Sequence, residues 1–454
     1  MNARDSLRRA ARSIFDATLA AMDARAAVRR ALNFADARLN ILDTEFNLNT
    51  RPLAIYSIAF GKAAGAMASA LDEVLGDALA GGVVSAPPLS FSLSGRWQVF
   101  AGGHPLPNES SLEAARAAFA LLRAANAAAP HALVIFLVSG GGSAMLEWPC
   151  EDSITLDDLR AANRALVSCG AGINEINSVR RAFSSVKGGG LAARAGRAAQ
   201  VSLIISDTKR DEPHNVASGA TFSFPFPDKS HDPSEIINRY QLAARLPASI
   251  LRAVERPRRS HAETGRAALR RHHTLLDNED ALARAAAAAA ALGFAVEIAR
   301  DVSEQAVAEG AGLLVSRLLD LRWREEGRAV CLISGGEFSC PVRGGGVGGR
   351  NAETVLRCAF EIEAHAAARS SSADDAAAPL VALSAGTDGI DGNSPAAGAL
   401  CDDTTLARAR ALSLDAQEFL AASDAHTFFA ALGDALTTGA TGTNVRDLRL
   451  LLTR

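Results

Sequence analysis

The sequence predicts an α/β protein in which parallel sheets carry helices on their faces. Five short apolar runs each lead into a glycine-bearing or polar turn, and helical patterns follow several of them. In parallel sheets ligands bind outside the carboxyl ends of the strands, where these turns lie. We therefore expect the unusual residues of the turns to converge. The runs cover residues 52–60, 131–138, 200–206, 329–334 and 379–384.

Composition limits the class of protein. With 454 residues, 48% of them hydrophobic, the chain can form two or three domains with substantial cores. Lys and Arg number 47 against 50 Asp and Glu, so no basic balance indicates a nucleic-acid partner. No apolar run approaches the ~20 residues of a membrane-spanning helix, and we expect no membrane partner.

Cysteine usage and the N-terminus both indicate a cytoplasmic protein. The six cysteines form no C-x-x-C pair and no zinc spacing, so reduced thiols are expected. Residues 1–32 are rich in Ala and Arg, as in a transit peptide, but Asp5, Asp16 and Asp23 argue against one. Their apolar spacing favours an amphipathic first helix. The sequence leaves monomer and homodimer both open.

A domain boundary is expected between about residues 225 and 280. Residues 223–233 are Pro-rich and residues 256–273 are basic and weakly patterned, both typical of connecting segments. Asp277 and Asn278 then read as caps of an alanine-rich helix. Residues 368–379 are small and polar, as in a loop tip. We assign residues 1–240 to an N-terminal domain, and 241–454 to a linker and a C-terminal domain.

The common nucleotide-binding signatures are missing. Gly61-Lys62 lacks the earlier glycine and the following Ser or Thr of a P-loop, and no G-x-G-x-x-G opens a βαβ unit. The protein-kinase motifs are also absent. A different phosphate-binding arrangement has to be considered.

Nine short motifs follow one another along nearly the whole chain. They are "FGKAAGAMA" (60–68), "GGHPLPNESS" (102–111), "VSGGGSAML" (138–146), "INEINSVRRAFSSVKGGGLA" (173–192), "SD" with "ASGAT" (206–221), "SGGE" with "GGRNAE" (334–353), "GTDGIDG" (386–392), "DAHTFF" (424–429) and "TGATGTNV" (438–445). In this order they resemble the glycerate 2-kinase family with a MOFRL C-terminal domain.

The resemblance implies a fold and an activity. It implies a Rossmann-like N-terminal α/β/α domain and a smaller C-terminal α/β (MOFRL) domain, with the active site in the cleft between them. The implied reaction is phosphorylation of D-glycerate to 2-phospho-D-glycerate, with ATP and Mg²⁺ required.

Two cations are expected at the phosphates. Lys62 follows a strand at a helix start and resembles the family's lysine, so we assign it to the transferred phosphoryl group; a solvated surface lysine is the alternative. Arg350 ends the stretch "GGGVGGR", whose glycines could wrap a phosphate while the guanidinium offers two parallel donors. Gly348, Gly349 and the helix-capping Asn351 belong to this predicted site. A floppy hairpin is the alternative.

Two further segments are candidate anion sites. The loop Ser139, Gly140, Gly141, Gly142 and Ser143 joins a strand to a helix, whose N–H groups could hold glycerate's carboxylate or a phosphate. Tight strand-to-helix packing would also explain its glycines. In residues 173–188, Asn177 and Arg180 share a helix face and could act on one anion, with Lys187 at the helix end. A charged surface helix is the alternative.

The carboxylates are less decisive. Asp207 and Asp388 lie at strand ends, where a Mg²⁺ ligand or a general base would be placed, and Asp207 is our catalytic candidate. Asp391 reads equally as a turn residue. Glu337 could bind Mg²⁺ or orient Arg350, and a structural ion pair is equally consistent with the sequence.

Departures from the family pattern keep other functions open. A kinase for another small hydroxy acid and a non-catalytic phosphometabolite-binding protein are the alternatives, whereas the missing dinucleotide fingerprint disfavours a hydroxypyruvate reductase. The departures are Arg210 for a glycine, Glu212 for its acidic counterpart, Ala220 and Ala440 for prolines, Ala352 for a glutamine, Pro395 for an aspartate, and the absence of a glycine before Asp277.

Overall fold

The computed structural model describes residues 2–223, 231–256, 269–369 and 378–454. These form two compact units, and each is described by itself. The N-terminal unit is Ala24–Leu276, and the C-terminal unit combines Met1–Asp23 with Asp277–Arg454. The predicted linker segments and loop tip lie largely outside the described residues.

The N-terminal unit differs at both of its ends from the predicted domain 1–240. It begins at Ala24 instead of residue 1 and ends at Leu276 instead of residue 240. Strand β9 (Arg270–Leu276) pairs in parallel with β8 (Ala199–Ile205), so the chain up to Leu276 completes the N-terminal sheet. Helix α1 (Ala3–Ala21) instead buries Leu7, Ile14 and Phe15 in the core of the C-terminal unit. Apolar packing, which composition does not reveal, sets both assignments.

The N-terminal unit contains a sheet of six parallel strands in the order β6-β5-β4-β7-β8-β9. Because β5 and β6 follow β4 on one side while β7 to β9 lie on the other, the strand order reverses between β4 and β7. This reversal is where doubly wound sheets bind ligands. The other strands of the sheet are β4 (Ala54–Phe60), β5 (Leu79–Ala86), β6 (Trp97–Ala101) and β7 (Ala132–Ser139).

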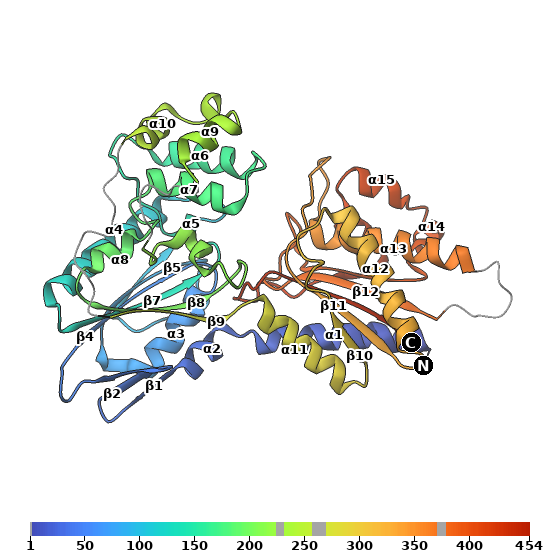
Figure 1. Ribbon diagram of the computed structural model, residues 1–454, viewed down its shortest axis with the longest axis horizontal. Helices are drawn as coiled ribbons and strands as arrows, with labels where there is room; N and C mark the ends of the chain where they lie inside the picture. The colour runs from blue at the N-terminus through green and yellow to red at the C-terminus, as the bar shows by residue number, and fades with distance from the viewer. Residues whose placement is uncertain (1, 224–230, 257–268, 370–377) are drawn as a thin grey trace. The chain divides into compact units, whose positions relative to one another are not determined.

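Helices cover both faces of this sheet, as the apolar strands require, with α3 on one face and α4 and α8 on the other (Figure 1). A small antiparallel sheet, β1-β2-β3, is separate. The helices are α2 (Ala24–Ala31), α3 (Ala64–Leu75), α4 (Glu109–Ala128), α5 (Gly142–Met145), α6 (Leu156–Val167), α7 (Ile173–Phe183), α8 (Gly190–Ala195), α9 (Pro233–Arg239) and α10 (Ala248–Glu255), with 3-10 turns at Gly76–Ala78, Pro213–Gly219 and Leu242–Ala244; the small strands are β1 (Leu32–Ala35), β2 (Arg38–Ile41) and β3 (Thr44–Asn47).

The C-terminal unit has a mixed sheet in the order β10-β11-β15-β12-β13-β14. Only β10 and β11 are parallel, because β15 enters between β11 and β12 and pairs antiparallel with both. The prediction of a parallel sheet is therefore wrong for this unit. Its strands are β10 (Ala295–Ile298), β11 (Val330–Ser334), β12 (Leu380–Gly386), β13 (Gly398–Asp402), β14 (Ala435–Leu436) and β15 (Asp447–Thr453).

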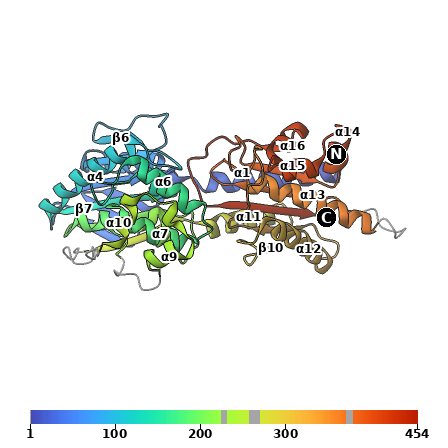
Figure 2. The ribbon, with the colours of Figure 1, turned by 90° about the horizontal axis from the view of Figure 1, so that it is seen from above.

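Two apolar layers enclose this mixed sheet. Helices α12 and α13 pack on one face and α1 and α11 on the other, while β15 runs through the middle of the unit (Figures 1 and 2). Asp277 caps α11 through a capping box with Asp280, as its sequence position predicted. The helices are α11 (Asn278–Ala291), α12 (Val307–Arg324), α13 (Arg350–Arg369), α14 (Thr405–Ala411), α15 (Ala416–Ala421) and α16 (Ala425–Leu432).

Of the six cysteines, Cys331, Cys358 and Cys401 are buried, and Cys150, Cys169 and Cys340 are partly exposed. Within the described parts of the chain, no helix combines the length and the apolar character needed to cross a membrane.

Candidate active site

The carboxyl ends of β4 and β7 meet at the strand-order reversal. The Lys62 backbone N–H donates to Gly140 O at 2.8 Å, and the Ala63 N–H donates to Ser139 Oγ at 3.0 Å. Gly61 has φ +115°, and a Cβ there would lie 2.4 Å from Ser139 O. Only glycine allows this close approach, which places Lys62 beside the loop 139–143.

A carboxylate and an imidazole complete this group. A Cβ on Gly140 would lie 2.1 Å from Asp207 Oδ2, and one on Gly141 would lie 3.0 Å from His104 Cδ2 and 3.2 Å from Lys62 Cγ. The loop glycines are thus surrounded by side chains from the ends of several strands. We call Lys62, His104, residues 139–143 and Asp207 the strand-end site.

The helix that follows the loop is shorter than the sequence suggested. Helix α5 spans four residues, Gly142–Met145, and Gly141 precedes it with φ +80°. A single turn carries little of the macrodipole of a long helix. The expectation that a helix N-terminus here holds an anion is therefore not supported, and the glycines serve close packing.

Asn177 and Arg180 lie together on α7, as predicted, but they contact the protein. Arg180 Nε donates to Asn163 Oδ1 at 3.0 Å and Nη1 to Asn177 Oδ1 at 3.5 Å. Burial lowers the Arg180 pKa to about 10. Asn177 Oδ1 also accepts from Ser218 Oγ at 2.8 Å, and Ser218 Oγ lies 2.7 Å from Ser143 Oγ. The pair reaches the strand-end site through Ser218.

The assignment of Lys187 to a ligand needs correction. Its side chain is 0% exposed and forms an ion pair with Glu147, which is equally buried and also accepts from Ser184 Oγ. Burial is the main cause that lowers the Lys187 pKa. An ammonium enclosed in this way stabilises the fold rather than a bound anion.

Removing Lys187 should therefore cost stability. We expect Lys187→Met to lower the free energy of unfolding by about 3 to 5 kcal/mol, because Glu147 is left as an uncompensated buried charge. The double variant Lys187→Met/Glu147→Gln should recover most of this loss. Urea unfolding of the three proteins measures it, and a double variant no more stable than the single one would contradict the ion-pair account.

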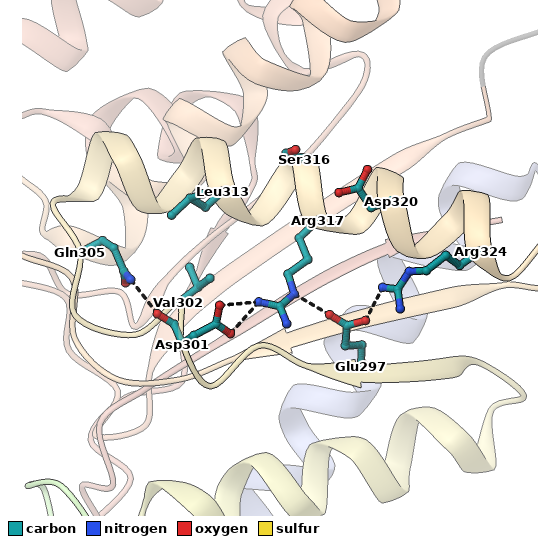
Figure 3. Close-up of a pocket in the computed structure, with 9 residues that line it drawn as sticks. All are labelled: Glu297, Asp301, Val302, Gln305, Leu313, Ser316, Arg317, Asp320 and Arg324. Carbon is teal, nitrogen blue, oxygen red and sulfur yellow. Dashed lines mark hydrogen bonds and ion pairs between the residues drawn. The ribbon is translucent and has the colours of Figure 1, made fainter.

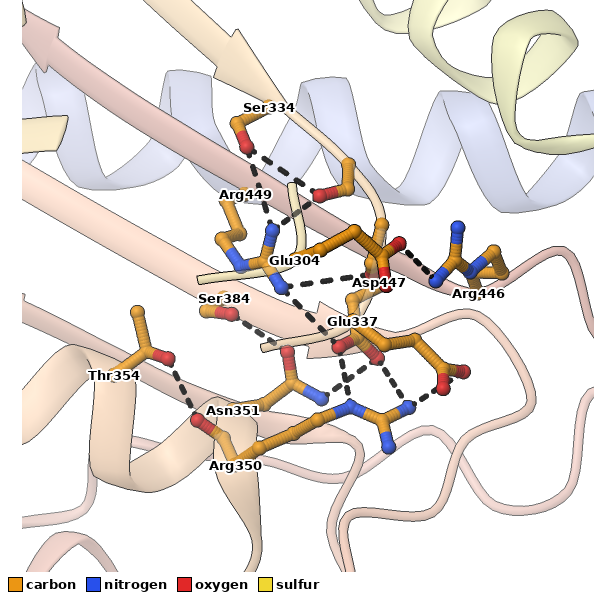
Figure 4. A network of polar contacts seen from close by, with 12 residues as sticks. Glu304, Ser334, Glu337, Arg350, Asn351, Thr354, Ser384, Arg446, Asp447 and Arg449 are labelled. Atoms are coloured by element: carbon orange, nitrogen blue, oxygen red, sulfur yellow. Dashed lines mark hydrogen bonds and ion pairs between the residues drawn. The ribbon is translucent and has the colours of Figure 1, made fainter. Parts of the chain in front are cut away.

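In the C-terminal unit, Arg350 is held by two carboxylates (Figure 4). Its Nε donates to Asp447 Oδ2 at 2.6 Å and its Nη2 to Asp447 Oδ1 at 3.1 Å, while Glu337 Oε1 lies 2.9 Å from Nη2. These carboxylates raise the Arg350 pKa, and the pKa of the buried Asp447 is lowered by Arg350 and Arg449. Both hydrogen bonds to Asp447 use Nε and Nη2. Glu337 is thus paired with Arg350, which fits both the orienting role and the structural ion pair that the sequence left open.

The glycine loop before Arg350 is ordered by protein contacts. The Val347 N–H donates to Asp424 Oδ1 at 2.7 Å and the Gly348 N–H to Asn393 Oδ1 at 2.8 Å. A Cβ on Gly349 would lie 2.4 Å from Asp391 Oδ1. The floppy-hairpin alternative is therefore wrong. The N–H groups of Val347 and Gly348 already have protein acceptors, so these two donors are not available to the predicted amide cradle.

Asn351 likewise contacts the protein. It is 1% exposed, its Nδ2 donates to Asp447 Oδ1 at 3.0 Å, and its Oδ1 accepts from Ser384 Oγ at 2.6 Å. The helix cap is Asp391, which accepts from the N–H groups of Asn351 and Ala352 at 2.9 and 2.8 Å. The prediction that Asn351 caps this helix is therefore wrong. The interpretation of Asp391 as a turn residue did not include its role as the cap of α13.

Asp391 should make stability depend on pH. Burial raises its pKa to about 6, from the usual 3.8. A raised folded-state pKa contributes stability below pH 4 that is lost as the pH rises through 6, on the order of 3 kcal/mol. We expect wild type to lose this much relative to Asp391→Asn between pH 4 and 7, measured by chemical unfolding. A pH-independent difference between the two proteins would contradict it.

A pocket of about 400 Å³ lies beside the ordered loop. Its wall combines the Arg350 guanidinium with the glycine backbone and with the apolar side chains of Phe338, Pro341 and Val342. Val342 is 83% exposed. A pocket that combines a guanidinium with apolar side chains suits a ligand that has both an anionic group and an apolar part.

A second pocket, of about 530 Å³, contains none of the predicted residues (Figure 3). Arg317 on α12 donates to Asp301 at 2.6 Å and is also paired with Glu297, which holds Arg324 as well. We assign no function to this pocket, since none of the residues that line it belongs to the predicted site.

The predicted metal ligands do not form a ready-made cluster. Among the residues that the structure describes, no group of three or more His, Cys, Asp or Glu side chains could hold a metal ion. Asp388 Oδ1 accepts from the Ile390 N–H at 3.1 Å, as in a turn, and Glu337 is paired with Arg350. Asp207 lies at the strand-end site, where its Oδ2 faces Gly140.

Three of the departures from the family pattern lie on the surface. Arg210, Pro395 and Ala440 are exposed. Ala352 is 2% exposed within α13, and its N–H is bound by Asp391.

Sequence reasoning missed several residues. His104 lies within one of the nine motifs, but the sequence predicted no role for it. It also predicted no role for Glu147, Ser218 or Asp447. Asp447 begins β15 and Glu147 follows α5, where no local pattern indicates a distant partner. The weak signal for Ser218 was its place in the motif "ASGAT", directly before Gly219.

Comparison with known proteins covers nearly the whole chain. Residues 10–255 match a family described as "Domain of unknown function (DUF4147)", and residues 330–447 match the MOFRL family. A putative hydroxypyruvate reductase of Agrobacterium vitis is 36% identical over 456 residues, covering 98% of this chain and 94% of that protein. A glycerate 2-kinase of Pyrococcus horikoshii is 34% identical over 436 residues, covering 94% and 93%.

A similar fold has also been solved. The crystal structure of a glycerate kinase from Thermotoga maritima superimposes with a TM-score of 0.78 at 28% identity. The match covers 99% of this chain and all of that one.

Proposed function

Since this chain belongs to the glycerate 2-kinase family with a C-terminal MOFRL domain, we propose that it transfers the terminal phosphoryl group of ATP to the C2 hydroxyl of D-glycerate. Kinase activity on glycerate follows from the family. ATP as the donor, Mg²⁺ as the cofactor, the 2-phospho product and a cytoplasmic location are our proposals.

The strand-end site is the observation that carries this function. Phosphoryl transfer needs a cation near the moving group and a carboxylate for the hydroxyl proton. Lys62 and Asp207 lie at the carboxyl ends of neighbouring strands and would meet these two needs, and the glycines of the loop 139–143 let them pack close together. We propose that Lys62 follows the phosphoryl group and that Asp207 accepts the proton of the reacting hydroxyl or binds Mg²⁺.

Bound Mg²⁺ would neutralise charge on the phosphate oxygens. Asp207 suits it as a single carboxylate ligand, since its Oδ2 faces the glycine loop. Glu337 does not suit it while paired with Arg350.

For Arg350 we propose a contact with the ATP phosphates. Asp447 fixes the plane of the guanidinium through Nε and Nη2, so Nη1 is not used by that pair, and Arg350 lines the pocket of about 400 Å³. A guanidinium held in one plane can present its remaining donors in a fixed direction.

Two alternatives differ in what they predict. A kinase for another small hydroxy acid is motivated by the departures near the predicted ligand residues, such as Ala352. Two relatives carry the name of a putative hydroxypyruvate reductase, yet the sequence has no G-x-G-x-x-G dinucleotide fingerprint opening a βαβ unit.

A coupled assay separates these functions. ADP release is screened over glycerate, erythronate, tartronate and glycolate, and NADH oxidation is followed with hydroxypyruvate in parallel. We expect ADP release with D-glycerate to be the fastest. The ³¹P signal of the product should be a doublet, because C2 carries one hydrogen, whereas a phosphate on C3 would give a triplet. NADH oxidation without ADP release would overturn the proposal.

A further inference from the structure

A chain of hydrogen bonds connects the buried Arg180 to Ser143. Arg180 Nη1 and Ser218 Oγ both donate to Asn177 Oδ1, at 3.5 and 2.8 Å, and Ser218 Oγ lies 2.7 Å from Ser143 Oγ. Ser218 is 0% exposed, whereas Ser143 is partly exposed. The chain therefore begins in the protein interior and ends at the strand-end site.

The orientation of the Asn177 amide is fixed by its neighbours. Asn215 Nδ2 donates to Asn174 Oδ1 at 2.6 Å and to Glu212 Oε2 at 2.8 Å, so Asn215 turns its own oxygen toward Asn177. Asn177 Nδ2 then donates to Asn215 O and Oδ1, both at 3.3 Å. Because all these partners are acceptors, the Asn177 oxygen has to face Ser218.

Each serine hydroxyl has one proton, and this determines the direction of the remaining bond. The Ser218 proton points to Asn177 Oδ1, so Ser218 Oγ can only accept from Ser143. The Ser143 proton is then used, and its oxygen presents only lone pairs to a ligand. Ser143 cannot donate to an anion without breaking this chain.

The backbone holds Ser218 in place. Ala217 and Ser218 adopt left-handed conformations with φ 50° and 54°, which cost residues other than glycine free energy. Ser218 O accepts from the Gly188 N–H at 3.1 Å. The main chain at Ser218 is thus fixed, and its side chain is held between Asn177 and Ser143 by the bonds at 2.8 and 2.7 Å.

We propose that Ser143 accepts a hydrogen bond from the non-reacting hydroxyl of the substrate, and thereby selects small acids that carry two hydroxyl groups. This inference rests on the proposed function and assigns the C3 hydroxyl of glycerate to Ser143. It replaces the expectation that Ser143 binds a carboxylate or phosphate, because lone pairs repel an anion. Asp207 remains the partner of the reacting hydroxyl.

Three acids test the direction of this bond: D-glycerate, D-lactate without the C3 hydroxyl, and the matching 3-fluorolactate. Fluorine has lone pairs but no proton, so it cannot donate to Ser143. Lactate and fluorolactate should both bind about 10- to 100-fold more weakly than glycerate. Affinity by calorimetry is the primary readout, since fluorine also withdraws electrons from the reacting hydroxyl; kcat/KM is measured alongside.

Variants locate the effect. Ser143→Ala should bring the three affinities within about threefold of one another, whereas Ser153→Ala, an exposed control, should leave the wild-type ranking intact. Ser218→Ala frees the Ser143 proton, so fluorolactate should then bind better than lactate. Unfolding curves check that each variant is folded.

The outcomes separate this inference from the proposed function. Fluorolactate binding as tightly as glycerate to wild type, or an unchanged glycerate preference in Ser143→Ala, would overturn the inference even if glycerate is phosphorylated. Absence of ADP release with every acid would overturn the proposed function. The affinities would still decide whether Ser143 accepts a hydrogen bond from the C3 hydroxyl. Equal binding of all three acids to wild type, or no binding of any of them, would also overturn the inference.

Discussion

Lys62→Ala should lower kcat by about 10²- to 10³-fold while changing ATP affinity much less. An ammonium that follows the moving phosphoryl group contributes mainly in the transition state, so its loss appears in turnover rather than in binding. Steady-state kinetics with D-glycerate give kcat, and calorimetry with ATP gives the affinity.

The control for Lys62 is Arg123→Ala, which removes an exposed cation from α4 and should leave both quantities unchanged. Lys62→Arg tests whether charge alone suffices beside Gly141, against which the Lys62 stem packs. An unchanged kcat in Lys62→Ala would remove Lys62 from the site.

Arg350→Lys should fail to rescue Arg350→Ala. An ammonium cannot engage both oxygens of Asp447, and it therefore loses the plane that the two bonds at 2.6 and 3.1 Å now fix. Loss of the oriented donor should cost about 2 to 4 kcal/mol of transition-state stabilisation in both variants. The measurement is kcat/KM for ATP, side by side.

Stability has to be followed in the same experiment. Both substitutions weaken the pairing of the buried Asp447, so unfolding curves establish a temperature at which both variants are folded. Arg357→Lys, on the same helix and paired with Glu353, is the matched control and should keep wild-type kcat/KM. Full activity in Arg350→Lys would mean that a simple charge is enough.

Three residues of the strand-end site could be predicted from the sequence, because each stands directly after a recognisable strand. Lys62, Ser139 and Asp207 each follow an apolar run, and parallel strands bring such turns together. The partners of Lys187 and Arg350 could not be predicted in the same way. Glu147 lies 40 residues from Lys187 and Asp447 lies 97 from Arg350, so only the folded chain pairs them.

Glycine clusters were the least specific signal. The same residue type indicates an amide cradle, a flexible hairpin or close packing, and composition does not distinguish them. In the loop before Arg350, the third explanation holds, because Gly346 and Gly349 lie against Asp424 and Asp391 with no room for a Cβ. The apolar runs of the C-terminal unit were similarly ambiguous, since a buried strand has the same composition whether its neighbours are parallel or antiparallel.

The assignment of α1 to the C-terminal unit has a consequence for the order of folding during synthesis. Its apolar stripe, with Leu7, Ile14 and Phe15, leaves the ribosome long before the sheet that buries it. That sheet needs β15, which is translated after the other strands of the sheet and lies between β11 and β12. The N-terminal unit can fold while the chain is still growing, whereas α1, although translated before that unit, is buried only after β15 has been made.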